Sequence, residues 1–131
     1  MEQNEKTKAL LAAFGCALAY LLAGKALAAV LPQVPEEAAR MWAFVHRCAA
    51  APIVEELVFR GIIQQLARPL GERQAVALQA VLFAVQHRGP ADMAYALVCG
   101  LVLGTLRSRT GSVWPGMLLH TLNNLLVFAA G

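Results

Sequence analysis

The sequence predicts an all-α, multi-pass transmembrane bundle of about five helices, four or five of them embedded in the membrane. Hydrophobic residues make up 59% of the chain and charged residues only 15%, against about 25% charged residues in a typical soluble domain. The mean hydropathy is +0.57. Long apolar runs alternate with short polar turns, and the length of 131 residues suits one domain. We therefore expect residues 1–131 to form a single membrane domain.

The first apolar segment is Ala9–Leu31, interrupted only by Lys25. It is long enough to cross a bilayer, which needs about 20 residues. A signal peptide is the alternative, since Ala26-Leu27-Ala28 resembles a cleavage site. The acidic residues near the N-terminus and the length of the run favour a retained membrane helix.

The segment Pro35–Arg47 mixes charged residues with large apolar ones. This mixture predicts an amphipathic helix at the membrane interface, which would complete an N-terminal part of residues 1–47. We interpret its Glu36, Glu37 and His46 as ordinary solvent-facing groups, because carboxylates in a wet, charged stretch need no special explanation.

Residues 48–131 contain four further apolar segments, separated by turns rich in Gly, Pro or Arg. They are Cys48–Leu66, Gln74–His87, Met93–Leu106 and Ser112–Ala130. The second and third are short for membrane spans and need a thinned bilayer or a water-filled cavity to cross. Gly100 and Gly104 form a small-residue pair that permits close helix packing and favours self-association.

The charge and cysteine patterns exclude other classes. The formal net charge is +3, but the basic residues stand singly among apolar runs, which argues against nucleic-acid binding and fits the flanks of membrane segments. The three cysteines, Cys16, Cys48 and Cys99, are far apart and form no CxxC pair. We interpret them as small buried hydrophobic residues rather than as a disulfide or a metal site.

The segment Ala51–Gly61 places two carboxylates and a guanidinium in an apolar setting, where charges are costly. On a helix, Glu56 and Arg60 are four residues apart and can pair. Glu55 lies about 100° round the helix from Glu56 and has no such partner. Pro52, one turn earlier, is expected to loosen or kink the helix. The pattern predicts a structural Glu56 and a working Glu55.

Two later apolar segments also carry polar groups at helical spacing. Phe83 and His87 are four residues apart, as are His120 and Asn124. A Glu and a His can activate water as a general base, and a second His with an amide can donate hydrogen bonds to an oxyanion. No Ser or Cys stands near a His at helical spacing, and HExxH is absent, so we expect water-driven peptide hydrolysis.

Three motifs, Glu55-Glu56-x-x-x-Arg60, Phe83-x-x-x-His87 and His120-x-x-x-Asn124, occur in this order on apolar segments. They resemble the signature of the CPBP family, the CAAX prenyl endopeptidase and bacteriocin-processing proteases, also called the ABI domain. The flanking Arg109-Thr110-Gly111-Ser112-Val113-Trp114-Pro115 is similar to bacterial members. The resemblance covers about residues 50 to 128 and implies an intramembrane glutamic-type endopeptidase with residues 48–131 as its catalytic core.

The resemblance also implies a role for each motif residue. Glu55 with His87 would activate the water, and His120 with Asn124 would form the oxyanion hole. The supporting residues would be Glu56, Arg60 and Phe83. No cofactor is expected.

The implied partners are the lipid bilayer and a membrane-embedded or lipidated peptide or protein substrate. The implied location is the cell membrane, which would be the inner membrane of a bacterium. Many family members carry more helices before the first motif, where this sequence has one long apolar segment. A second copy or a partner membrane protein is therefore an open expectation.

Three alternatives stay open. A zinc-dependent hydrolase would use Glu55, His87 and His120 as ligands with an open fourth position. A non-catalytic member would use the same polar groups for bacteriocin self-immunity or as a scaffold. An ion or proton carrier is less well supported, since only one unpaired carboxylate is available.

Overall fold

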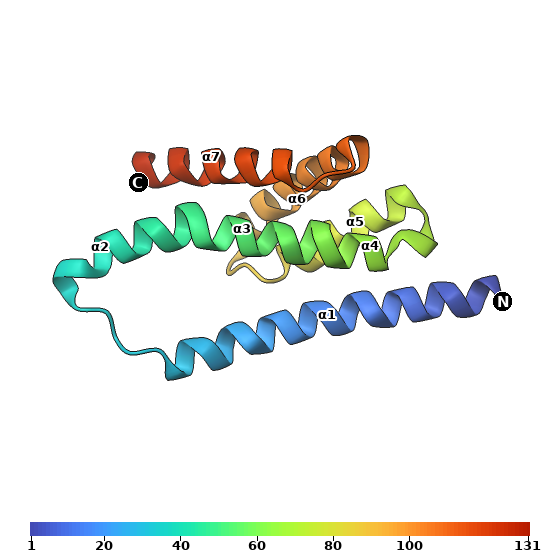
Figure 1. Ribbon diagram of the computed structural model, residues 1–131, viewed down its shortest axis with the longest axis horizontal. Coiled ribbons are helices and arrows are strands. Elements are labelled where there is room, and N and C mark those ends of the chain that lie inside the picture. Colours follow the sequence, from blue (N-terminus) through green and yellow to red (C-terminus); the bar gives the residue numbers. More distant parts are fainter.

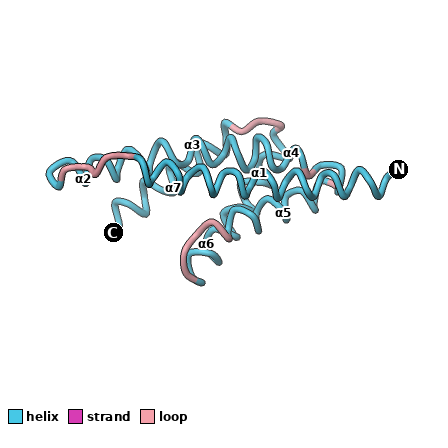
Figure 2. Tube along the Cα trace, turned by 90° about the horizontal axis from the view of Figure 1, so that it is seen from below, coloured by secondary structure: helices cyan, strands magenta, loops and turns pink.

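The computed structural model describes residues 1–131 and contains helices and short connections but no strands (Figures 1 and 2). This confirms the predicted all-α class. Four separate long helices are α1 (Glu2–Val30), α5 (Glu72–Ala84), α6 (Pro90–Thr110) and α7 (Trp114–Ala130). A fifth helical run comprises α2 (Glu36–Val45), η1 (His46–Ala50), α3 (Ala51–Glu55), η2 (Glu56–Ile63) and α4 (Gln64–Leu66), and the short η3 (Arg68–Leu70) follows it.

The helical run from α2 to α4 corrects the prediction of two separate helices, Pro35–Arg47 and Cys48–Leu66. It continues without a break through Pro52 (Figure 1). Proline has no N–H and its ring crowds the carbonyl one turn back. The π-helical η1 lies just before this position, and the Ala51 N–H bonds to the carbonyl of His46 there. The wider turn accommodates Pro52, so the helix is loosened rather than ended.

The helix α6 is longer than the predicted segment Met93–Leu106. Pro90 occupies its first turn, where a missing N–H costs nothing, and Gly111 ends it in the left-handed conformation at φ 70°. Arg107 and Arg109, expected in a turn, lie in its last turn, where cations are favourable. Both α6 and α1 are long and apolar enough to cross a membrane.

The close packing predicted for Gly100 and Gly104 is realised between α6 and α5. A Cβ atom added to Gly100 would lie 2.9 Å from both Cα and Cβ of Ala80. Buried Gln79 donates from Nε2 to the carbonyl of Gly100 at 2.7 Å. This face is therefore covered by α5, which removes it as the surface for the expected self-association.

We expect Gly100→Ala to destabilise the protein by about 1–3 kcal/mol, because its methyl group would overlap the backbone of α5. The matched control is Gly24→Ala on α1, where an added Cβ has no atom within 4 Å. There the better helix propensity of alanine should leave stability unchanged or raised. Unfolding in a denaturing-detergent titration would measure both, and equal effects of the two substitutions would contradict the packing.

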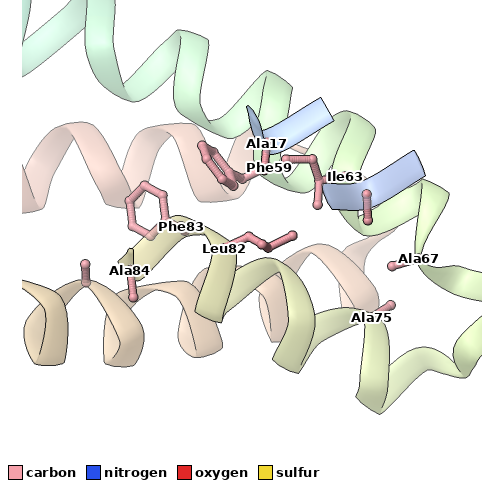
Figure 3. Packing of buried hydrophobic residues seen from close by; sticks show 10 residues of the cluster. Ala17, Phe59, Ile63, Ala67, Ala75, Leu82, Phe83 and Ala84 are labelled. Atoms are coloured by element: carbon pink, nitrogen blue, oxygen red, sulfur yellow. The ribbon is translucent and has the colours of Figure 1, made fainter. Parts of the chain in front are cut away.

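The apolar core lies where α1, η2 and α5 meet (Figure 3). Ala17 of α1, Phe59 of η2 and Phe83 of α5 are all buried in it. The Phe59 ring packs edge-on against Tyr20, with centroids 5.4 Å apart, and against Phe83, with centroids 5.2 Å apart. These contacts fix the orientation of η2 and α5, which carry the first two polar motifs.

Candidate active site

A cavity of about 820 Å³ lies between the α2–α3 part of the long helical run, the N-terminal half of α6 and α7. The four predicted catalytic residues line it together: Glu55, His87, His120 and Asn124. Phe83 lines it as well. The structure therefore brings three sequence motifs, from segments far apart in the chain, to one hollow.

Glu55 and Glu56 are neighbours in sequence but have different surroundings. The side chain of Glu55 is 20% exposed and borders the cavity. The side chain of Glu56 is 1% exposed and lies behind the cavity wall. Residues next to each other on a helix point about 100° apart, which produces this division.

His120 of α7 lies between the two carboxylates. Its Nδ1 is 2.8 Å from Oε1 of Glu56, and its Nε2 is 3.5 Å from Oε2 of Glu55. Because this contact is short, Nδ1 of His120 carries a hydrogen and donates it to the carboxylate of Glu56. The second ring nitrogen then faces Glu55 at the edge of the cavity, so the buried carboxylate orients the imidazole.

Arg60 completes the buried layer behind the cavity. Its Nη1 is 3.1 Å from Oε1 of Glu56, and both side chains are almost wholly buried, so the predicted pair is confirmed. Its guanidinium also lies over the ring of Phe83, 4.4 Å from the centroid. The guanidinium N–H groups make no hydrogen bond of good geometry, so charge attraction is the main contact with Glu56.

His87 lies outside the helix in which it was predicted, because α5 ends at Ala84 and His87 stands in the following turn. It still contacts Phe83: its Nδ1 is 3.0 Å from the carbonyl oxygen of Phe83, and the two rings are 4.8 Å apart. The backbone contact assigns the hydrogen to Nδ1 and leaves Nε2 as the free ring nitrogen. The predicted proximity is confirmed, although the helical geometry behind it was wrong.

Asn124 is tied to the long helical run. Its Nδ2 donates to the carbonyl of Arg47 at 2.8 Å. An amide nitrogen carries two hydrogens, so one donor is left for a ligand. The neighbouring Asn123 accepts a hydrogen bond from the hydroxyl of Tyr95, which links α7 to α6 across the cavity.

Several residues of the cavity wall were not predicted from the sequence. They are Arg40, His46, Arg47, Asp92, Tyr95, Cys99 and Asn123. His46, interpreted as an ordinary solvent-facing group, is exposed and also borders the cavity. The missing signal was helical spacing across the supposed helix boundary: Arg40, Arg47, Ala51 and Glu55 recur on one face once the two helices are joined.

The zinc alternative requires Glu55, His87 and His120 to converge on one point. Only the contact of His120 with Glu55 is short, and no three His, Cys, Asp or Glu side chains form a metal-binding cluster. These residues do not fit a zinc ion in this arrangement, so no step below passes through a metal.

The helical fold and the Glu, His and amide groups that line one cavity agree with the class of membrane peptidase that the motifs indicated. A family model described as Rce1-like, type II CAAX prenyl endopeptidase Rce1-like, matches residues 37–126. This chain therefore belongs to the Rce1-like family of type II CAAX prenyl endopeptidases, which are membrane proteases. The match confirms the resemblance found in the sequence. Neither the curated proteins nor the solved structures provide a match.

Proposed function

We propose that this protein is an intramembrane endopeptidase that hydrolyses peptide bonds of membrane-associated or prenylated substrates with a water activated by Glu55. The observation that carries the proposal is the position of Glu55. Its carboxylate alone of the adjacent pair reaches the cavity, while Glu56 is engaged by His120 and Arg60. A carboxylate in a partly desolvated wall is suited to accept a proton from water.

In the proposed reaction, His87, which lines the same cavity, holds the water and Glu55 accepts one of its protons. The water oxygen attacks the carbonyl carbon of the peptide bond and produces an oxyanion. The C–N bond then breaks, and the proton held by Glu55 passes to the departing amine. The products are a new carboxylate and a free amine, so no covalent enzyme intermediate is needed.

The oxyanion would be stabilised from α7. The Nδ1 of His120 is held by Glu56, and its Nε2, at the edge of the cavity beside Glu55, would donate to the oxyanion when it carries a hydrogen. Asn124 contributes the amide hydrogen that Arg47 does not use. In this proposal Glu56 and Arg60 are positioning residues, because they act through His120 and do not border the cavity.

We also propose a multi-pass placement in the cell membrane, the inner membrane in a bacterium. Two helices, α1 and α6, are long and apolar enough to cross, and the run from α2 to α4 is longer than α6. The buried charges of this run pair within the protein, as a lipid environment requires. A homo-oligomer or a partner membrane protein remains part of the proposal.

The test is cleavage of a farnesylated CAAX-type peptide by the purified protein in lipid nanodiscs, followed by mass spectrometry. We expect release of the residues after the farnesylated cysteine by the wild type and loss of this cleavage in Glu55→Gln. A wild type that cleaves no prenylated or unmodified membrane peptide would contradict the proposal and favour the non-catalytic self-immunity or scaffold alternative.

We expect cleavage to survive metal removal, because the polar groups of the cavity do not gather as a metal-binding cluster. Dialysis against EDTA followed by addition of 1,10-phenanthroline should change the rate by less than about twofold, well below the loss expected for a missing metal-bound nucleophile. A loss restored by zinc would instead support the zinc-dependent alternative.

A further inference from the structure

The cavity extends well beyond Glu55 along one face of the long helical run. Arg47 and Arg40 border it on the N-terminal side of Glu55, and α7 packs beside this part of the run (Figure 1). Phe44 and Phe128, with ring centroids 5.5 Å apart, hold α2 and α7 together there. The hollow is thus long, with a carboxylate in one part and guanidinium groups in another.

The charges of Arg40 and Arg47 have no partner within the chain. Neither side chain forms an ion pair or donates a hydrogen bond, whereas Arg68, also near a helix end, pairs with Glu72. Asp92 is the acidic residue of the cavity wall apart from Glu55, and it makes no ion pair with either arginine. The arginine end therefore presents positive charge to whatever enters the cavity.

We propose that Arg47 binds the free C-terminal carboxylate of the peptide substrate, with Arg40 adding positive charge behind it. The inference rests on the proposed endopeptidase function and assigns a specificity residue for it. A guanidinium binds a carboxylate through two parallel N–H donors. A peptide placed with its carboxylate at Arg47 would run along the cavity toward Glu55.

The distances agree with a short leaving peptide. Glu55 follows Arg47 by eight positions along the helix, which is roughly 12 Å at about 1.5 Å per residue, a little less through the wide η1 turn. An extended peptide advances about 3.3 Å per residue, so roughly three residues span the same gap. Arg47 would place the scissile bond near Glu55 only when the chain ends a few residues later.

The experiment measures binding separately from cleavage. Two fluorescein-labelled peptides carry a farnesylated cysteine fourth from the end, one with a free carboxylate and one with a C-terminal amide. Fluorescence anisotropy with Glu55→Gln protein in nanodiscs should show that the free-acid peptide binds at least about tenfold more tightly than the amide peptide. This is the difference in affinity expected when one charged hydrogen-bonding partner is removed. Adding Arg47→Gln should remove the difference, and Arg47→Lys should restore part of it.

The matched control is Arg73→Gln on α5, an exposed arginine outside this cavity, which should keep the full preference. Equal binding of acid and amide, or binding of neither, would overturn the carboxylate site. An equal weakening of both peptides by Arg47→Gln would assign the arginine to lipid headgroups or structure instead. Wild-type cleavage of either peptide tests the proposed function independently, since it can persist when the acid preference is absent.

Discussion

Replacing Glu55 by Gln should reduce peptide cleavage by about 10²–10⁴-fold, the range attributed to a positioned general base. Glutamine has the same size as glutamate and can still form hydrogen bonds, but its amide cannot accept a proton from water. Glu55 borders the cavity and is only partly buried, so the folded state should persist. Initial rates of product release at saturating peptide, measured for wild type and variant in the same lipid, would give the change.

The control for this loss is Glu37→Gln, which removes an exposed carboxylate from the same helical run outside the cavity. It should retain the wild-type rate, and both variants should match the wild type in helical circular dichroism. If Glu55→Gln kept more than about a tenth of the activity, Glu55 would not be the base. The buried Glu56 could not replace it without a rearrangement, because it lies behind the cavity wall.

The residues of the candidate site could be selected from the sequence, since each polar motif stands out in an apolar segment. Charges at Glu55, Glu56 and Arg60 are costly in such a setting, and the four-residue spacing of Glu56 and Arg60 is a local property of any helix. The contact of His120 with Glu56 is different in kind. It joins residues 64 positions apart, and helical spacing contains no information on how α7 docks against η2.

The errors in the helix boundaries have local physical causes. The run was divided after Arg47, where a charged stretch meets an apolar one, but the helix continues there through the wide η1 turn. Pro90 was assigned to a turn, although proline is favoured in the first turn of a helix. The first error had the larger consequence for function. Dividing the run at residue 47 hid the common face of Arg47 and Glu55, and with it the arginine end of the cavity.

Replacing Arg60 by Met should lower the free energy of unfolding by about 3–5 kcal/mol, the cost of leaving a buried charge without its partner. The Arg60 and Glu56 side chains are 0% and 1% exposed and their charged atoms lie 3.1 Å apart. In the variant, the Glu56 carboxylate keeps only His120 as a partner. Equilibrium unfolding in mixed micelles of mild and denaturing detergent would measure the difference.

The exposed pair of Lys6 with Glu2 is the matched control, because it has the same four-residue spacing and opposite charges in contact with solvent. Lys6→Met should produce no measurable change, since exposed ion pairs contribute little. The double variant Glu56→Leu with Arg60→Met should recover part of the loss, because it removes both buried charges. A cost below about 1 kcal/mol for Arg60→Met would show that water reaches the pair. The loss of unfolding free energy therefore tests whether water is excluded from the Glu56–Arg60 pair that orients His120, and the measurement needs no substrate.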